Sequence, residues 1–169
     1  VIIPMICYLL FKNHNNKNSG DDKLGTKVDY DAIVVGAGFA GLALIHHLKK
    51  LGISLKVFDK ASGIGGTWNW NKYPGAATDS EGYYYCLSFS KEIMQEWTWS
   101  ERYPGWEETN RYLHFVADKC NMWPDIQLNT EIISAEFSND KKIWIVTTNN
   151  GEKLSCKYFI SAMGMISLS

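Results

Sequence analysis

The sequence predicts an α/β fold, in which a parallel sheet with a glycine-rich β-α-β unit is followed by an antiparallel β-meander. Three observations predict it. The apolar run 32–35 leads directly into a G-x-G-x-x-G turn at residues 36–41. Leucine and isoleucine then recur at helical spacing over residues 44–51. Further apolar stretches lie within residues 132–160, two of them separated by an Asn-Gly pair.

The first unit is expected to be strand, helix and strand. Residues 32–35 form a continuous apolar run, which is typical of a parallel strand buried on both faces. Four apolar residues then recur at helical spacing: Leu44, Ile45, Leu48 and Leu51. Gly52 stands where a glycine commonly ends a helix. Residues 53–58 predict a second strand that ends at Asp59.

The elements that follow are less regular. Residues 61–106 show no steady period and are expected to be irregular, although they hold eleven of the 23 aromatic residues. Residues 107–120 predict a helix with four side chains on one face: Tyr112, Phe115, Val116 and Lys119. Asn150-Gly151 signals a hairpin turn between the last two of three predicted strands, at residues 132–137, 143–148 and 153–160.

Length, composition and charge restrict the class of protein. The chain has 169 residues, of which 46% are hydrophobic and 21% charged, as expected of one globular domain rather than a disordered chain. With 17 basic and 18 acidic residues, the formal net charge is -1. Because phosphate backbones require a basic face, this balance argues against nucleic acid as a partner.

The N-terminal segment is expected to lie outside the domain. Residues 1–11 form an apolar run that is too short for a bilayer, which takes about 20 residues, so no clear membrane segment is expected. The run fits the tail of a signal or anchor, or upstream sequence foreign to the protein, and we favour the second. We therefore expect an apolar and disordered segment and linker at residues 1–27 and a nucleotide-binding domain at 28–169.

The cysteine spacing excludes the common metal-binding and disulfide patterns. The four cysteines contain no C-x-x-C pair: Cys7, Cys86, Cys120 and Cys156. We expect reduced thiols in a cytoplasmic protein and no metal site.

The G-x-G-x-x-G segment 36–41 predicts a dinucleotide-binding turn. Gly36 permits the tight turn, Gly38 lets the backbone approach a pyrophosphate, and Gly41 allows close packing of helix on strand. Phe39 and Ala40 complete the segment at the start of the helix, whose N-terminus favours phosphate. Asp59 follows the last glycine by 18 positions, where a carboxylate binds ribose hydroxyls and repels a 2′-phosphate. The alternative is a glycine-rich turn without a ligand.

A second glycine cluster lies at residues 63–66, just past Asp59. Another close backbone approach suits a long cofactor such as FAD, whose pyrophosphate and flavin both need a binding surface. The alternative is a surface loop, which Trp68 and Trp70 make less favourable because mobile loops seldom carry two indoles.

From Tyr30 onward the chain resembles the class B flavoprotein monooxygenases of the Baeyer–Villiger type, which include cyclohexanone monooxygenase. The resemblance rests chiefly on G-G-T-W-N-W-N-K-Y-P-G-A at residues 65–76. It extends over six further stretches: 35–41, 58–60, 79–89, 130–132, 144–148 and 162–164. Four residues depart from the usual pattern: Asn69, Lys72, Gly82 and Met163. Asn69 and Gly82 are expected to reshape a substrate pocket.

The resemblance implies a Rossmann-like FAD-binding domain within an incomplete two-dinucleotide-binding-domain flavoprotein. NADPH would bind mostly outside this chain and reduce the flavin, which captures O2 as a C4a-peroxyflavin. That species converts a ketone to an ester or lactone. The chain would be the N-terminal part of this enzyme, ending before the NADPH domain.

The resemblance also assigns roles to single residues. Asp79 matches the catalytic aspartate, although Thr78-Asp79-Ser80 also fits a turn or helix cap. Lys60 is expected near the adenosine, and Ile132 at the adenine. The other residues expected at the cofactor are Gly36, Gly38, Phe39, Ala40, Gly41, Asp59, Gly66, Thr67, Trp68, Trp70, Tyr85, Met163 and Gly164. Neither Arg102 nor Arg111 matches the catalytic arginine.

Two other functions stay open. The first is an N- or S-oxidising flavin monooxygenase, and the second, from another class, is a catalytically inert nucleotide-binding fragment. The five tryptophans within residues 68–106 fit core and interdomain packing, or a dry wall around a flavin. His46 and His47 are expected at the surface. The sequence gives no oligomeric state.

Overall fold

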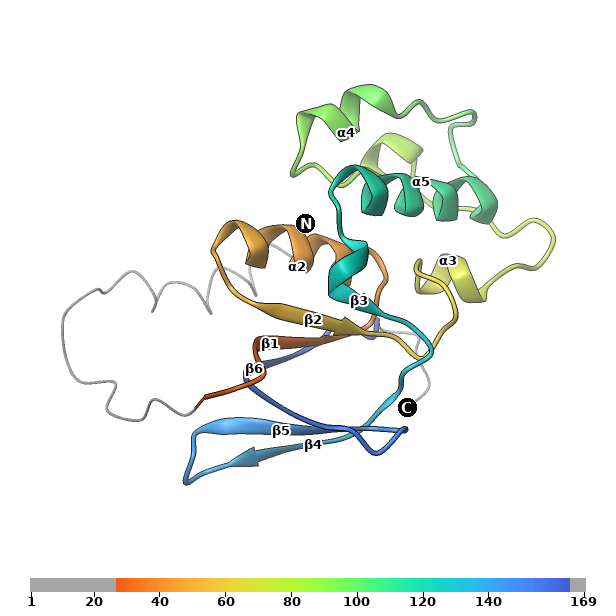
Figure 1. Ribbon diagram of the computed structural model, residues 1–169. Helices are drawn as coiled ribbons and strands as arrows, with labels where there is room; N and C mark the ends of the chain where they lie inside the picture. The colour runs from red at the N-terminus through yellow and green to blue at the C-terminus, as the bar shows by residue number, and fades with distance from the viewer. Residues whose placement is uncertain (1–26, 165–169) are drawn as a thin grey trace.

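The structure is a computed structural model that describes residues 27–164. Helices lie on one face of a sheet, and a β-hairpin lies on the other side (Figure 1). The strand order is β3-β2-β1-β6-β5-β4. Strands β3, β2, β1 and β6 are parallel, and β6, β5 and β4 are antiparallel. The predicted combination of parallel sheet and β-meander is thereby confirmed. The predicted N-terminal segment lies outside the described residues, except for residue 27.

The β-α-β unit forms as predicted. It consists of β1 (Tyr30–Val35), α2 (Phe39–Lys50) and β2 (Leu55–Phe58). Gly52 has φ +72°, and its N–H donates to the Lys49 carbonyl, which ends the helix. Strand β2 begins two residues later than predicted. The reason is that the Ile53 N–H bonds back to the Leu48 carbonyl, so this residue still belongs to the helix end.

The prediction that residues 61–106 are irregular is wrong in part. The segment contains α3 (Thr67–Trp70), the 3₁₀ turn η1 (Gly82–Tyr85) and α4 (Lys91–Glu96). Elements of four to six residues complete hardly more than one turn, so no apolar period can develop in the sequence. The Ser90 hydroxyl caps α4 by accepting a hydrogen bond from the Ile93 N–H.

The predicted long helix is α5 (Trp106–Lys119), followed by the 3₁₀ turn η2 (Trp123–Asp125). Its face is not quite the predicted one, because Lys119 is exposed and Phe115 only half-buried. The buried residues are Glu108, Thr109, Tyr112, Leu113, Val116 and Ala117.

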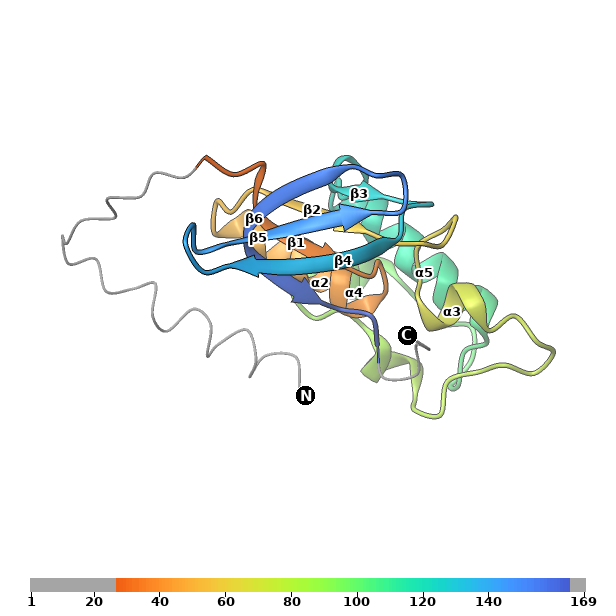
Figure 2. The same cartoon turned by 90° about the horizontal axis from the view of Figure 1, so that it is seen from below.

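The remaining strands are β3 (Ile126–Gln127), β4 (Ile132–Ser138), β5 (Ile143–Thr148) and β6 (Lys153–Ser161). Strand β3 was not predicted, because two residues give no pattern. The Asn-Gly hairpin is confirmed, since Gly151 has φ +82° and its N–H donates to the Thr148 carbonyl. Strand β6 pairs with both β5 and β1, and so joins the meander to the parallel sheet (Figure 2).

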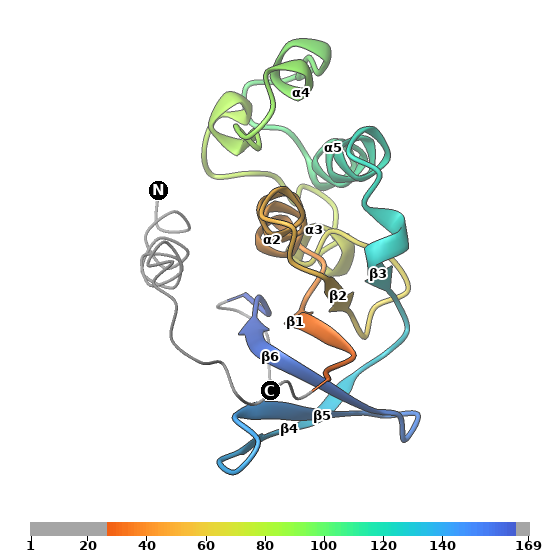
Figure 3. The ribbon, with the colours of Figure 1, turned by 60° about the vertical axis from the view of Figure 1, so that its left-hand side comes forward.

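Both faces of the sheet are packed. The larger core lies between the sheet and the helices, where β1 contributes Ala32 and Val34 and α2 contributes Leu42 and Ile45. On the other face Ile33, Phe58, Val146 and Cys156 form a second cluster. The meander therefore covers the side of β1 that the helices leave open (Figure 3).

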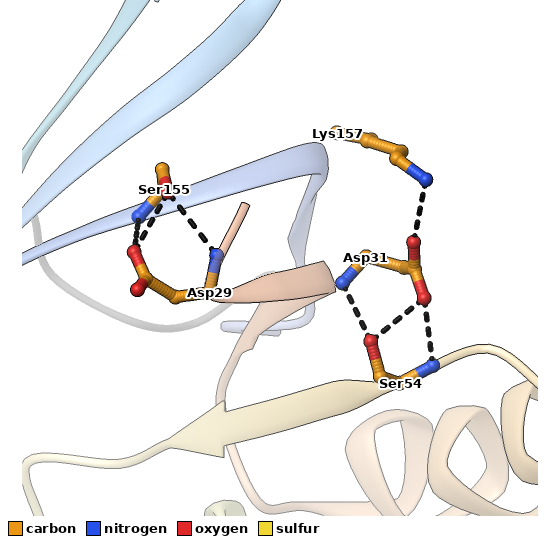
Figure 4. Close-up of polar contacts among 5 residues, drawn as sticks. All are labelled: Asp29, Asp31, Ser54, Ser155 and Lys157. Atoms are coloured by element: carbon orange, nitrogen blue, oxygen red, sulfur yellow. Dashed lines mark hydrogen bonds and ion pairs between the residues drawn. The ribbon is translucent and has the colours of Figure 1, made fainter. Parts of the chain in front are cut away.

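Two aspartates at the start of β1 form hydrogen bonds with the segments on either side of this strand (Figure 4). The Asp29 carboxylate accepts hydrogen bonds of 2.8 and 2.7 Å from the N–H and hydroxyl of Ser155. The Asp31 carboxylate accepts from Ser54 and, at 2.8 Å, from the Lys157 ammonium. The hydrogen bonds from Lys157 and Ser54 lower the pKa of Asp31 to about 2. These contacts stabilise the sheet edge opposite the carboxyl ends of its strands.

The described cysteines, Cys86, Cys120 and Cys156, are free thiols. Cys7 lies outside the described residues. Burial raises the pKa of Cys156 to about 11. Within residues 27–164, no helix has the length and hydropathy needed to cross a membrane. In the same residues, no three His, Cys, Asp or Glu side chains gather as a metal-binding group.

Candidate nucleotide-binding site

The candidate site lies at the carboxyl ends of the parallel strands. Gly36 follows β1, Asp59 follows β2, and Ala162 follows β6. Because these strands run in one direction, the three residues meet at one edge of the sheet. Open α/β sheets bind their ligands at this edge.

The backbone fills the space beside two of the predicted glycines. Gly36 has φ +109°, and a Cβ atom on it would lie 2.5 Å from the Ala162 carbonyl oxygen. A Cβ atom on Gly41 would lie 2.0 Å from the Gly36 carbonyl oxygen. A side chain at either position would push β6 or α2 away from the turn.

The two glycine-rich segments cross at Gly38 and Gly66. A Cβ atom on Gly38 would lie 3.5 Å from the Gly66 Cα, and one on Gly66 would lie 3.2 Å from the Gly38 Cα. The Gly65 N–H donates to the Ala37 carbonyl at 3.0 Å, which fixes the crossing. We call Gly36, Gly38, Gly65 and Gly66 the glycine junction.

The first turn of α2 opens from the glycine junction. Gly38 is the N-cap residue, and neither a side-chain cap nor an acidic residue occupies this end of the helix. The first N–H groups of a helix have no partner within it, and they carry the positive end of the helix dipole. This arrangement of side-chain-free backbone and open donors fits a pyrophosphate.

Asp59 has a structural task that the sequence did not reveal. Its carboxylate is 8% exposed and accepts hydrogen bonds from the N–H groups of Ala37, at 2.7 Å, and Ala61, at 2.9 Å. Asp59 therefore holds the glycine turn in shape. A carboxylate oxygen can accept two hydrogen bonds, so each oxygen of Asp59 can still accept one from a ribose hydroxyl.

The loop before β4 lies beside Asp59 and Lys60 and leads to Ile132. The Thr130 N–H donates to the Asp59 carbonyl at 2.9 Å, and the next residue but one, Ile132, begins β4. Lys60 lies with its ammonium 3.9 Å from the Glu131 carboxylate, and both side chains are half-exposed. The buried Thr130 was not predicted, because a lone threonine in a loop gives no signal.

Three aromatic rings gather beside the glycine junction. The Tyr85 ring meets Phe39 at 5.3 Å and Trp68 at 5.7 Å between centroids, both edge-to-face. These predicted residues come from η1, α2 and α3, so the fold unites them. Thr67 and Trp70 are exposed on α3, Trp70 at 59%.

Asp79 lies close to this aromatic group. Its side chain is exposed and makes no hydrogen bond or ion pair with any other described residue. Burial raises the pKa of Tyr85, and the negative charge of Asp79 raises it further. The local turn bond comes from Thr78, whose hydroxyl donates to the Ser80 carbonyl at 2.8 Å. The carboxylate of Asp79 is thus free to meet a ligand.

The other predicted residues divide between packed and open positions. Met163 and Gly164 follow β6, where Met163 is 54% exposed. Asn69 lies against the backbone of Gly63, and Gly82 lies beneath the Trp99 indole. Both departures from the family pattern therefore face packed protein. Asn110, which was not predicted, donates to the Ile64 carbonyl and supports the Gly65 turn.

The tryptophans and the histidines are also divided. Trp97 and Trp99 pack against Tyr112, as the interpretation of core packing predicts, whereas Trp70 is exposed. The prediction that both histidines are surface residues fails for His46, which stacks on Phe89 at 4.1 Å and is half-buried. Burial lowers the pKa of His46. A pocket lined by this side chain lies at the other end of α2 from the glycine junction.

The chain is similar to a known domain family and to known monooxygenases. Residues 34–97 match the family model of the NAD(P)-binding Rossmann-like domain. The chain is 46% identical over 137 residues to acetone monooxygenase (methyl acetate-forming) of Gordonia sp., covering 81% of this chain and 26% of the relative. It is also 46% identical over 142 residues to a phenazine N-monooxygenase of Lysobacter antibioticus, covering 83% and 26%.

Solved structures agree with these relatives. A steroid monooxygenase bound to NADP superposes with a TM-score of 0.81 at 42% identity, covering 83% of this chain and 27% of that one. The OTEMO complex with FAD and NADP also gives 0.81, at 33% identity, covering 85% and 27%. The chain thus spans about a quarter of the length of the proteins it matches.

Proposed function

Because the chain is homologous to flavoprotein monooxygenases of the Baeyer–Villiger type, we propose that it forms the FAD-binding part of a ketone-oxidising enzyme. The enzyme would use NADPH and O2 to convert ketones to esters or lactones. The observation that carries the proposal is the glycine junction, with Asp79 and Tyr85 beside it. The matching relatives include one that forms methyl acetate from acetone.

The pyrophosphate of FAD would bind at the glycine turn. Gly36 and Gly41 allow the close packing that shapes this turn, Gly38 leaves its backbone without a side chain, and the N–H groups around Phe39 and Ala40 open the helix. Gly66, which lies against Gly38, would line the opposite side of the pyrophosphate. Because Asp59 shapes this turn through Ala37, its carboxylate serves the phosphate site as well as the ribose.

The adenosine would lie along Asp59, Lys60 and Ile132. The hydrogen bond from the Thr130 N–H to the Asp59 carbonyl holds the start of β4 beside Asp59. A carboxylate at the ribose position disfavours a 2′-phosphate, which supports FAD rather than NADP in this site.

The flavin end would lie beside Phe39, Trp68 and Tyr85. Thr67, Trp70, Met163 and Gly164 would line its edges. When bound, FAD would supply the redox chemistry, namely acceptance of a hydride from NADPH and activation of O2 for transfer of one oxygen atom to the substrate. The aromatic side chains exclude water from this region, and Asp79 provides a carboxylate that orients a cationic group.

We also propose a division of the chain into a segment at residues 1–27 and an FAD-binding domain at 28–169. NADPH would bind mostly on residues outside this chain. Residues 1–169 alone would therefore oxidise no NADPH. Stopped-flow absorbance of the isolated chain with FAD and NADPH tests this, and measurable turnover would contradict it.

Turnover by the full-length protein tests the activity. Purified protein is mixed with FAD, NADPH and a panel of linear and cyclic ketones, and the products are analysed by gas chromatography and mass spectrometry. We expect esters or lactones carrying one 18O atom from 18O2. NADPH consumption without any ester across the panel would contradict the proposal.

N-oxidation is the second candidate, because a phenazine N-monooxygenase is as similar to the chain as the acetone enzyme. The same assay therefore includes phenazines, amines and sulfides. N-oxide formation with no ester would establish this alternative in place of ketone oxidation.

We propose a cytoplasmic location. The free thiols of Cys86, Cys120 and Cys156 support it, since an oxidising compartment favours disulfides. Fractionation of cells that express the tagged full-length protein tests it, and recovery in a secreted fraction would contradict it.

A further inference from the structure

The loop that carries Asp79 is held by a second segment of the chain, residues 99–106, which we call the strap. Backbone hydrogen bonds join the two on both sides of Asp79. The Thr78 N–H donates to the Pro104 carbonyl at 3.0 Å, and the Gly82 N–H donates to the Arg102 carbonyl at 2.8 Å. The Asp79 side chain has no partner among the described residues, so these bonds fix the backbone from which its carboxylate projects.

Trp99 contacts both ends of the turn that carries Tyr85. A Cβ atom on Gly82 would lie 2.8 Å from the Trp99 ring, so the indole rests directly on the glycine. At the other end, the Trp99 Nε1–H donates to the Cys86 sulfur at 3.3 Å. Tyr85 lies between these two contacts and reaches the aromatic group beside the glycine junction.

Glu108 anchors the strap to α5. Its carboxylate is 7% exposed and accepts hydrogen bonds of 2.8 Å from both the N–H and the hydroxyl of Ser100. A carboxylate on the buried face of a helix is costly unless it is hydrogen-bonded. Both carboxylate oxygens of Glu108 accept hydrogen bonds from Ser100, the residue that follows Trp99.

We propose that Glu108 and Trp99 are positioning residues, which hold Asp79 and Tyr85 against the cofactor site through the strap. The inference rests on the proposed function. Neither residue lies among the predicted cofactor contacts. Their effect on turnover therefore passes through Asp79.

A double-mutant cycle in the full-length protein tests this relay. Glu108→Ala should lower kcat about tenfold, because a displacement of about 1 Å costs up to a hundredfold in rate. Asp79→Asn should lower it further, and the double variant should match Asp79→Asn alone. A purely structural role predicts that Glu108→Ala lowers kcat by the same factor in both backgrounds, and that result would overturn the proposal.

Matched variants separate position from stability. Glu108→Gln keeps acceptor and donor groups for Ser100 and should restore most of kcat. Glu107→Ala, one residue earlier and exposed, should leave kcat and FAD affinity unchanged. If Glu108→Ala does not fold, Trp99→Phe takes its place in the cycle, because it removes the indole N–H but keeps a ring on Gly82.

A second readout needs no turnover. The pKa of Tyr85, followed by NMR of labelled tyrosine with Tyr85→Phe for assignment, should fall in Asp79→Asn and also in Glu108→Ala. Glu107→Ala should not change it. An unchanged Tyr85 pKa in Glu108→Ala would show that the strap does not place Asp79. Wild-type protein that binds no FAD and oxygenates no ketone would instead refute the proposed function. The tyrosine titration would still test whether the strap positions Asp79.

Discussion

The Asp59 carboxylate accepts a 2.7 Å hydrogen bond from the N–H of Ala37, a residue 22 positions earlier, inside the glycine turn. A second bond from Ala61 fixes the other oxygen. The residue expected to meet a ribose is thus also the support of the phosphate turn. Loss of its carboxylate should disturb both parts of the nucleotide site.

Asp59→Ala should lower the free energy of unfolding by about 3–6 kcal/mol, because two buried N–H groups lose a charged acceptor worth about 1.5–3 kcal/mol each. FAD affinity should fall with it. Urea denaturation and FAD titration measure the two effects. Lys60→Ala, the exposed neighbour, should leave the unfolding free energy within about 0.5 kcal/mol. Equal stability of Asp59→Ala and wild type would show that the carboxylate does not support the turn.

Gly36→Ala should destabilise the protein by about 2–4 kcal/mol, from the positive φ and the overlap with the Ala162 carbonyl. Thermal or urea unfolding checks the value. Gly75→Ala is the matched control, because Gly75 also has a positive φ, +82°, but nothing lies within 4 Å of its Cβ position. Its cost should be limited to the strain of the backbone, about 1–2 kcal/mol. Equal losses in the two variants would show that the Ala162 contact is unimportant.

Tyr112→Phe should cost about 1–3 kcal/mol, because it leaves the buried Leu87 N–H without its acceptor. The phenol oxygen accepts this bond at 2.7 Å, and burial raises the pKa of Tyr112 above its usual value. Tyr84→Phe serves as the control, since Tyr84 is 71% exposed and should change stability little. A Tyr112→Phe protein as stable as wild type would mean that water satisfies the Leu87 N–H instead.

Stability should depend on the ionisation of Asp31 between about pH 4 and pH 2. The folded pKa of about 2 lies below the ordinary value of 3.8, so the contribution is present above about pH 4 and is lost as the pH falls toward 2. After allowance for solvent screening, it amounts to about 1–2 kcal/mol at neutral pH. Asp31→Asn should flatten this part of the stability curve, measured by urea denaturation. Asp140→Asn, in the exposed β4–β5 turn, should not flatten it, and identical curves for wild type and Asp31→Asn would refute the assignment.

The sequence predicts the local part of the site well. Gly36, Gly38 and Gly41 form a motif whose meaning depends only on a strand before it and a helix after it, and both elements form as predicted. The crossing of Gly38 and Gly66 could not be predicted, because it joins segments 28 positions apart through backbone contact alone. The same limit applies to Ala162, which reaches Gly36 only once β6 has paired with β1.

The strap shows the other limit of prediction from sequence. Glu108 stands on the apolar face of a helix that the pattern does predict, and a carboxylate in such a place indicates a buried partner. The pattern does not name that partner, since Ser100 lies in a segment without a period. Short elements such as α3, α4 and β3 were missed for the same reason, because tertiary contacts rather than a repeating pattern stabilise them.

Strand β6 also decides when this domain can fold during synthesis. Its residue Ser155 bonds to Asp29, 126 positions earlier, so β1 leaves the ribosome long before the strand that must lie beside it. At about 5–20 residues per second, the growing chain waits roughly 6–25 seconds with that strand edge uncovered. During this interval the nascent polypeptide is open to aggregation. We therefore expect chaperone binding to precede release of β6, as ribosome profiling of chaperone-bound nascent chains would detect.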